Sequence, residues 1–312
     1  MGRAMKKFLV YASAVVAALC AMSCQMDKEA APAQEVAVSI SLEMPQSIAV
    51  KSLSQAENTD IVYYEIWNSD WSKQLYPVDN TTLASAVVSG KTATIDLTLV
   101  SSQTYNFIFW AQNEACGAYN VNDLKKVVVD YSVISTAATR DQFDAFYAVK
   151  QIAVNGPINE TIVLTRPFAQ INFGTDTMNT TLGAIEVGET KVTIPNLATV
   201  FNTIDGVGET QTTAPVTFVA DGLATTEKLS TNNKKYTWVT MDYVLMMGEK
   251  DNAEIVASFD LGMENPVVHT VSSVPMKKNY RTNIVGDLFT TDAVLSIYVE
   301  PAFNTPDEVV GL

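Results

Sequence analysis

Histidine and cysteine, two side chains that often carry catalysis, are scarce in this chain of 312 residues. His269 is the single histidine, and it lies in an alternating stretch, Val267 to Val271, that is typical of a strand whose imidazole faces solvent. A Ser-His-Asp triad usually places its serine in a strained turn such as Gly-x-Ser-x-Gly, and the sequence contains no such turn. Pairs of carboxylates such as Asp141 and Asp144 are expected from the acidic composition alone, and nothing in the sequence marks one of them as a general acid. We therefore expect no enzyme, no catalytic residue and no cofactor.

The cysteines and acidic turns do not predict a metal site. Cys20 lies inside the N-terminal apolar run and Cys24 directly follows it, which leaves Cys116 as the only other thiol. A single thiol with neither Lys nor His beside it builds neither a disulfide nor a zinc site. The acidic turns at residues 176–179 and 251–254 have too few ligands for calcium. We expect no bound metal.

Cys24 is the residue to which the sequence assigns a chemistry, the attachment of lipid. Three basic residues stand within the first seven positions, and residues 8–21 form an apolar run too short to span a bilayer but long enough for a signal-peptide core. Cleavage before Cys24 would leave an acylated N-terminus. We predict a signal peptide at residues 1–23 and a polar, lipidated tether at residues 24–34. An ordinary cleaved signal with an unmodified cysteine is the alternative.

Charge and length narrow the class of protein further. The formal net charge is −14, and loss of the basic signal peptide would make the mature chain more acidic. A strongly acidic surface repels phosphate backbones, so we expect no nucleic-acid partner. A chain of this length folds as one or two domains, and we favour two.

Beyond the tether, apolar and polar residues alternate with the period of two that marks a half-buried strand. The alternation is strict at Val36, Val38, Ile40 and Leu42. Similar runs recur, separated by turn-forming residues, at 61–67, 92–99, 105–110, 127–133, 143–149, 161–165, 169–173, 191–194, 199–202, 216–220, 236–246, 254–260, 267–274, 281–288 and 294–299. Many short strands predict an all-β fold of antiparallel sandwiches, with helix only at 122–126 and 136–142.

The series of strands is interrupted at Arg166–Pro167, where proline cannot donate a backbone hydrogen bond to a central ladder. We place the domain boundary there. The prediction is an N-terminal β-sandwich at residues 35–165 and a C-terminal β-sandwich at residues 166–312.

The densest group of aromatic residues contains Tyr63, Tyr64, Trp67, Trp71 and Tyr76. Such rings usually fill a sandwich core, because burial of large aromatic side chains dominates core energetics. Trp71 lies beyond the strand, in a polar turn. We therefore name Trp71 as the candidate glycan contact.

Three segments carry information beyond their periodicity. Residues 144–148 read DAFYA, residues 164–175 read LTRPFAQINFGT, and residues 279–290 read NYRTNIVGDLFT, followed by a strand and the turn EPAF. In this order they resemble the late strand of the first domain, the start of the second domain and the C-terminal signature of the fimbrillin-like lipoproteins of Bacteroidetes, the subunits of type V pili. The resemblance implies two tandem transthyretin-like antiparallel β-sandwich domains after a lipoprotein signal peptide, and a role in assembly or adhesion.

A sandwich whose first strand precedes a flexible segment can lose that strand and expose a groove that another chain's strand fills. The candidate removable strand carries Val36, Val38, Ile40 and Leu42, and the flexible segment is residues 45–59. The candidate donor is the C-terminal strand with its tail, represented by Val294, Ser296 and Tyr298.

Release of the first strand requires a cut in the flexible segment. In the resembling family a trypsin-like protease, often specific for arginine, makes this cut. This sequence has no arginine between Arg3 and Arg140, so Lys51 is the candidate maturation site and the mature chain would begin near Ser52. If no cut occurs, the chain keeps its first strand and its lipid, as an anchor or a non-polymerising surface protein would.

These observations predict a fimbrial (pilus) subunit or fimbrillin-like adhesin. It would be an outer-membrane lipoprotein at the surface of a Gram-negative bacterium. Its expected partners are other fimbrial subunits, a host surface or glycan, and the membrane that holds its lipid anchor. The alternative is a glycan- or ligand-binding surface lipoprotein that does not polymerise.

Overall fold

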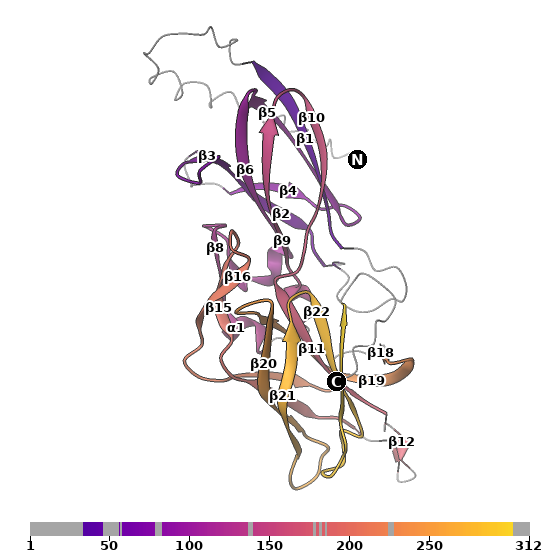
Figure 1. Cartoon of the computed structure of the whole chain (residues 1–312). Helices are drawn as coiled ribbons and strands as arrows, with labels where there is room; N and C mark the ends of the chain where they lie inside the picture. The colour runs from indigo at the N-terminus through magenta and orange to yellow at the C-terminus, as the bar shows by residue number, and fades with distance from the viewer. Residues whose placement is uncertain are drawn as a thin grey trace, which may run out of the picture.

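The fold is nearly all β, which confirms the predicted fold class. The computed structural model describes residues 34–45, 56, 58–78, 83–136, 140–176, 179–180, 183–184, 186–223 and 228–301. Within these residues the helical elements are α1 (Tyr131–Ile134) and two 3-10 turns, Glu114–Cys116 and Asp141–Phe143. The molecule is elongated, with the earlier half of the chain above the later half in Figure 1.

Two sheets face each other in the first half. One has the order β10-β1-β5, with β10 at Ile158–Val163, β1 at Glu35–Glu43 and β5 at Thr92–Val100. The other has the order β3-β2-β6-β9, with β3 at Gln74–Tyr76, β2 at Ile61–Asn68, β6 at Gln103–Gln112 and β9 at Phe146–Val154, and β4 (Ala84–Val87) also pairs with β2. Apolar side chains from both sheets form one core. The alternation of the sequence places these side chains on the inner faces.

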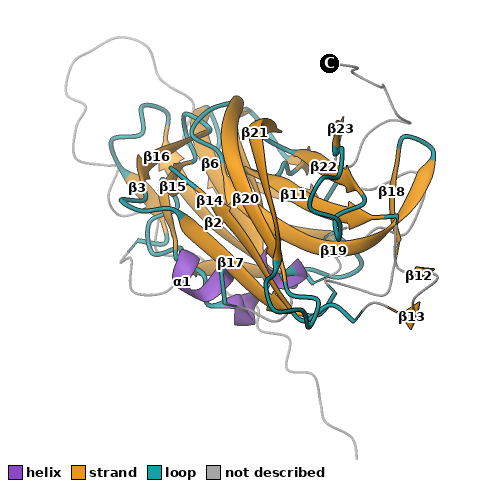
Figure 2. Ribbon diagram, turned by 90° about the horizontal axis from the view of Figure 1, so that it is seen from below, coloured by secondary structure: helices purple, strands orange, loops and turns teal. Residues whose placement is uncertain are grey.

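Two larger sheets form the second half (Figure 2). One has the order β18-β19-β11-β22-β23, with bounds Lys228–Thr231, Lys234–Leu245, Phe168–Thr175, Tyr280–Gly286 and Ser296–Pro301. The other has the order β17-β14-β20-β21, with bounds Val216–Asp221, Glu189–Ile194, Lys250–Phe259 and Val267–Lys277. A short hairpin pairs β12 (Asn179–Thr180) with β13 (Gly183–Ala184). Phe173 of β11 and Phe259 of β20 meet in the core between the large sheets, with ring centroids 6.0 Å apart.

A further sheet joins the two halves. Its order is β16-β15-β8-β7, with bounds Val207–Gln211, Ala198–Asn202, Lys126–Val129 and Tyr119–Asn120. The Phe201 ring of β15 lies 4.6 Å from the Tyr147 ring of β9 and 6.1 Å from the Trp110 ring of β6, centroid to centroid. The predicted boundary between residues 165 and 166 stays a prediction. Around it, residues from both sides share one core.

Two of the strand pairings are parallel. β1 runs parallel to β10, and β11 runs parallel to β22, whereas the other ladders are antiparallel. A parallel pair needs a long connection, so its partners are far apart in sequence. Val38 faces Ile158, for example. Periodicity along the chain identifies such strands but not their partners.

Some local sequence predictions are wrong. The strand predicted at 127–133 ends at Val129, because the Asp130 side chain accepts a hydrogen bond from the Ser132 amide (2.9 Å) and caps α1. The helix predicted at 122–126 is a bend and turn that leads into β8. Residues 137–139 of the helix predicted at 136–142 lie outside the described part of the chain, and the 3-10 turn at Asp141–Phe143 overlaps its end.

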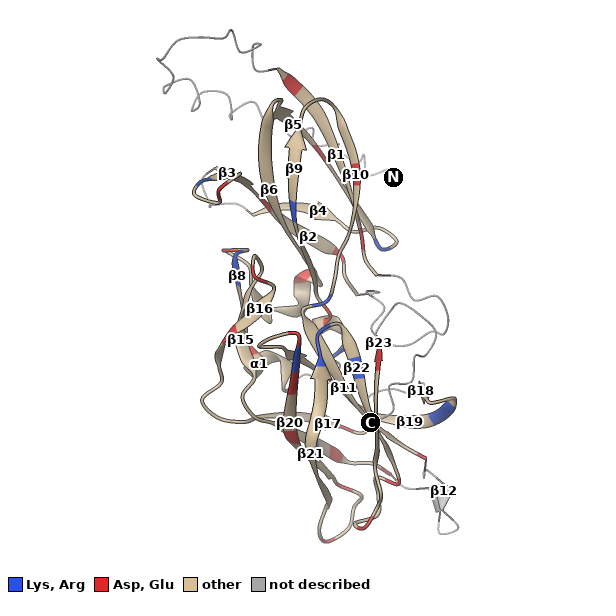
Figure 3. Cartoon of the chain, in the orientation of Figure 1, with Lys and Arg blue, Asp and Glu red and all other residues tan. Residues whose placement is uncertain are grey.

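Asp and Glu residues are distributed along both halves of the molecule, as Figure 3 shows. This distribution agrees with the acidic composition that makes a nucleic-acid partner unexpected. Among the described residues, no helix has the length and apolar character needed to cross a bilayer.

Candidate functional site

Strand β1 lies in the centre of its sheet, between β5 and β10. It pairs antiparallel with β5 from Glu35 to Glu43 and parallel with β10 from Val38 to Glu43. Val36, Val38, Ile40 and Leu42 are buried, and the residues between them are half-buried or exposed. A strand with this alternation presents one apolar row to the core and one polar row to solvent. The four predicted residues therefore form a single apolar row.

The floor beneath this row belongs to the facing sheet. It includes Phe107 and Phe109 of β6, whose rings stack with centroids 5.8 Å apart, and Tyr64 of β2. β5 and β10 have β1 as their only ladder partner among the described strands. Without β1, the backbone edges of both strands and these aromatic rings would line an open groove.

Hydrogen bonds at both ends fix the register of β1. The Ser101 amide donates to the Gln34 carbonyl (2.8 Å) at one end, and the Met44 amide donates to the Lys91 carbonyl (2.9 Å) at the other. On the polar face, the Ser39 hydroxyl donates to the Asp96 carboxylate (2.7 Å). These contacts hold the strand in one register, because a slip of one residue would turn its apolar row toward solvent.

Ala56, which lies between β1 and β2 in the sequence, contacts the buried Asp144–Arg166 ion pair. The buried backbone of Ala56 donates to the carboxylate of Asp144, which forms a buried ion pair with Arg166. Burial raises the pKa of Asp144, while Arg166 and the donated hydrogen bonds act in the opposite direction. Ala56 adopts a φ of 59°, which is unusual for a residue with a side chain. Lys51 and Cys24 lie outside the described residues.

The candidate donor strand, β23, lies at the edge of its sheet, paired with β22. Val294 precedes it and is 89% exposed, and Ser296 is also exposed. Tyr298 is half-buried, and its hydroxyl accepts a hydrogen bond from Asn232 (2.9 Å). Glu300 is buried and accepts a hydrogen bond from Asn283 (2.9 Å). All of β23 pairs with β22, but the side chains at its start are exposed, whereas Glu300 at its end is buried.

Trp71 lies in the turn after β2, with a φ of 65°, and is half-buried. The Lys125 amine is 3.2 Å from the Trp67 ring centroid and 5.7 Å from that of Trp71, and it donates to the Trp71 carbonyl (2.9 Å). Lys125 therefore covers part of the aromatic surface through cation–π contacts. The role of Trp71 as a glycan contact stays a prediction.

A cleft of about 540 Å³ opens where the two halves meet. Val163 of β10 and Ile204 of the β15–β16 turn line it and are 55% and 38% exposed. At one side the Lys278 amine donates to the Gly206 carbonyl (2.9 Å) and forms an ion pair with Glu249 (2.5 Å). The cleft combines exposed apolar side chains with a polar wall.

The sequence matches a family model over nearly its whole length. The model is described as a family of unknown function, DUF6562, and it matches residues 29–310. The chain belongs to this family. No curated protein matches it.

Solved structures share the fold of this DUF6562 chain. A candidate cell adhesion protein from Bacteroides ovatus has a TM-score of 0.52 and 10% identity, with 86% of this chain and 98% of that chain covered. A candidate cell adhesion protein from Bacteroides uniformis has a TM-score of 0.51 and 16% identity, with the same coverage. The tip fimbrial protein Mfa3 from Porphyromonas gingivalis, with a C-terminal truncation, has a TM-score of 0.50 and 9% identity, with 86% and 100% covered. At these identities the likeness establishes a shared fold.

One expectation for this DUF6562 chain, the exposure of the His269 side chain, is wrong. The sequence predicted that its imidazole faces solvent, but the side chain is buried, and its Nε2 lies 2.9 Å from the Leu288 carbonyl oxygen. The Phe259 and His269 rings lie 6.2 Å apart, centroid to centroid. The loop after β22 supplies Leu288 and covers this face of β21, which a pattern along one strand does not reveal. The histidine is therefore a packed core residue.

Cys116 is buried, and burial raises the pKa of its thiol. A raised pKa keeps the thiol protonated and unreactive. In the part of the chain that the structure describes, no group of three His, Cys, Asp or Glu residues could hold a metal ion.

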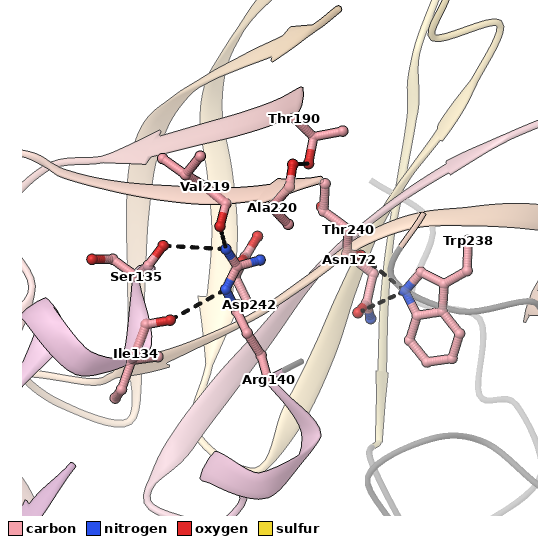
Figure 4. A network of polar contacts seen from close by, with 10 residues as sticks. All are labelled: Ile134, Ser135, Arg140, Asn172, Thr190, Val219, Ala220, Trp238, Thr240 and Asp242. Carbon is pink, nitrogen blue, oxygen red and sulfur yellow. Dashed lines mark hydrogen bonds and ion pairs between the residues drawn. The ribbon is translucent and has the colours of Figure 1, made fainter. Parts of the chain in front are cut away.

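A buried polar network around Arg140, Asp242 and Trp238 of this DUF6562 chain was not predicted from the sequence (Figure 4). Arg140 and Asp242 form an ion pair (2.9 Å) with almost no exposed surface. The Trp238 indole nitrogen lies 3.2 Å from the Asn172 side-chain oxygen and donates to the Thr240 carbonyl (2.9 Å). Charged and amide residues inside strand patterns were the only available signal, since their partners are distant in sequence.

Proposed function

We propose that this chain is a surface-exposed fimbrial subunit or fimbrillin-like adhesin that assembles by donor-strand β-augmentation. The observation that carries the proposal is the position of β1, whose apolar row lies between two strands that have no other ladder partner among the described strands. Strand addition to such a groove supplies main-chain hydrogen bonds, and alternating side chains fix the register. A shared fold with proteins described as adhesion and fimbrial proteins adds support.

The energetics require an incoming strand that resembles β1. Burial of each large aliphatic side chain contributes about 1.5–3 kcal/mol to the free energy of folding. Loss of β1 would remove several of these contributions at once. A donor with apolar residues at alternate positions would restore them. The β23 segment and its tail are the proposed donor, through Val294, Ser296 and Tyr298. The buried Glu300 would remain as its anchor.

Maturation and anchoring complete the proposal. A protease that accepts lysine would cut at Lys51 and release β1 together with the lipid on Cys24. Before that cut, the lipid would hold the chain in the outer membrane, since acyl chains partition into bilayers. Other fimbrial subunits would be the assembly partners, and a host surface or glycan the adhesion partner.

A closed, ligand-binding surface lipoprotein is the second candidate function. The cleft between the halves favours it, because exposed Val163 and Ile204 beside polar groups resemble the mixed lining of a ligand site. In that function β1 would stay in place and Trp71 or the cleft would contact a glycan.

Limited digestion with a lysine-specific protease, followed by electron microscopy and N-terminal sequencing, tests the first proposal. We expect fibres whose subunits begin at Ser52, and we expect Lys51→Gln to remain monomeric under the same treatment. A synthetic peptide of residues 35–45 should suppress fibre growth, because it refills the groove. The same peptide with Ile40→Asp is the matched control and should not suppress it. Fibres whose subunits retain residues 25–51 would contradict strand release.

A further inference from the structure

The turn between β9 and β10 contains the only Asn-Gly pair in the sequence, Asn155–Gly156. We infer that Asn155 is a site of spontaneous covalent modification, at which the side chain loses ammonia and becomes aspartate or isoaspartate. Asparagine is a chemically labile residue, and a following glycine offers the least hindered backbone nitrogen. The site needs no enzyme and only water as co-reactant.

The reaction is an intramolecular acyl transfer. The Gly156 backbone nitrogen attacks the side-chain carbonyl carbon of Asn155, a new C–N bond forms, and the C–NH2 bond breaks. The nitrogen's proton leaves with the amino group as ammonia, and a five-membered succinimide remains. Water then opens either carbonyl of the ring, which gives aspartate or an isoaspartate whose main chain is longer by one CH2 group. No electrons are exchanged with an oxidant or reductant.

The local geometry around Asn155 permits this reaction. Asn155 is exposed, and no residue in the described part of the chain holds its side chain or the Gly156 amide by a hydrogen bond. Apart from Gly156 and its two chain neighbours, no heavy atom lies within 4 Å of the position that a Cβ on Gly156 would occupy. The chain around the attacking nitrogen therefore has room to rotate toward the side chain.

Asn68 gives a contrast within the same molecule. It also precedes a small residue, Ser69, at the start of a turn. However, its side-chain nitrogen donates to the Ser72 hydroxyl (2.9 Å), and its side-chain oxygen accepts from the Lys73 amide (3.0 Å). Both ends of the amide are fixed, so Asn68 should react far more slowly than Asn155.

The modification would act on the strand that supports β1. The turn at Asn155–Gly156 carries the chain from β9 in one sheet to β10 in the other, and β10 is the parallel partner of β1 from Val38 onward. An isoaspartate adds a backbone atom at this crossover and would loosen the β10–β1 ladder. This consequence for strand exchange rests on the proposed function, whereas the reaction at Asn155 does not.

Incubation of the folded chain at mildly alkaline pH, followed by peptide mass mapping, tests the inference. Replacement of NH2 by OH raises the mass of the peptide that contains the asparagine. We expect Asn155 to show this increase sooner than any other asparagine, and part of its product to be isoaspartate. Gly156→Ala is the matched variant, since its methyl group would meet no atom within 4 Å beyond the two neighbouring residues, and the fold should keep its melting temperature. Its conversion should be at least about tenfold slower, because the methyl group hinders the attacking nitrogen.

Three results would overturn the inference. They are conversion of another asparagine before Asn155, equal rates in the parent and in Gly156→Ala, or conversion of Asn155 only after unfolding in denaturant. Asn155→Asp reproduces one product without the added backbone atom. If the loosening of β10 comes from isoaspartate, hydrogen exchange in β1 should rise in the aged parent and stay unchanged in Asn155→Asp. If hydrogen exchange in β1 does not rise in the aged parent, the inferred reaction at Asn155 still stands, but its link to strand exchange is contradicted.

Discussion

Asp242 of β19 and Arg140, which precedes the 3-10 turn at Asp141–Phe143, lie almost without solvent contact, 2.9 Å apart. Burial raises the pKa of Asp242 to about 6, although the Arg140 guanidinium and the nearby Thr240 hydroxyl oppose the shift. The Arg140 guanidinium also donates to three backbone carbonyls, those of Ile134, Ser135 and Val219. These acceptors help to satisfy the guanidinium when the carboxyl group takes up a proton.

This carboxyl group should make stability depend on pH. Its pKa in the folded state, about 6, lies above the ordinary aspartate value of 3.8, so the folded state holds an extra proton between these two pH values. The stability that this proton binding contributes is present at low pH and is lost as pH rises through about 6. We expect the free energy of unfolding of the parent, relative to Asp242→Asn, to fall by about 1 kcal/mol as the pH is raised from about 5 to about 7. Denaturant titration of both proteins at both pH values measures this difference, and a constant difference would contradict it.

At the scale of secondary-structure elements, the tight turn between β4 and β5 affects stability. Gly90 and Lys91 form a two-residue turn between Ser89 and Thr92, and both have positive φ, 60° and 77°. Two positive φ values match the twist of a tight hairpin, which favours glycine or asparagine at both positions. Lysine at the second position therefore carries backbone strain.

Replacement of Lys91 by glycine should relieve this strain. We expect Lys91→Gly to raise the free energy of unfolding by about 1 kcal/mol, because a left-handed conformation costs a residue with a Cβ roughly 1–2 kcal/mol. Thermal denaturation measures the gain. Lys73→Gly, at an exposed turn residue without positive φ, is the control and should give no gain. A lower melting temperature for Lys91→Gly would refute the assignment of strain.

The apolar row of β1 should contribute far more to stability than its polar row. Ile40 has no exposed surface, whereas its neighbour Ser41 is half-buried on the other face. Truncation of a buried isoleucine costs about 2–5 kcal/mol, so Ile40→Ala should lower the free energy of unfolding by that amount. Ser41→Ala should change it by less than about 0.5 kcal/mol. Similar losses for the two variants in denaturant titration would mean that β1 is not seated as described.

At the scale of the whole molecule, the two halves share packing that crosses the predicted boundary. Val127 of β8 faces Phe201 of β15 in one ladder, and Leu124 is buried in the same core as Phe168 and Ile284. The two halves are therefore expected to depend on each other for part of their order. The first sandwich also has a core of its own, which includes Val38 and Phe107.

A chain that ends at residue 165 should separate these two contributions. We expect its amides at residues 118–134 to lose protection from hydrogen exchange, because the residues that cover them belong to the second half. Amides in residues 103–109, which pack in the first core, are the internal control and should stay protected. Hydrogen exchange with mass spectrometry compares the fragment with the full chain. Full protection of residues 118–134 in the fragment would show that the first half is complete without the second.

The sequence by itself determined the all-β class and the position of most strands. Alternation at Val36, Val38, Ile40 and Leu42 is local information, because side chains in a strand point to opposite faces with a period of two. The predicted burial of this row follows from residue type and neighbours alone. Such features depend on residues that are close in the chain.

The tertiary structure decided what depends on distant residues. The parallel pairing of β1 with β10, the burial of His269 beneath Leu288 and the ion pair of Arg140 with Asp242 each join positions that no local pattern connects. Capping by Asp130 likewise ended a run that reads as one strand. Burial and pairing are properties of the packed sheets. The alternation along a strand decides which face a side chain is on, but the tertiary structure decides which residues pack against that face.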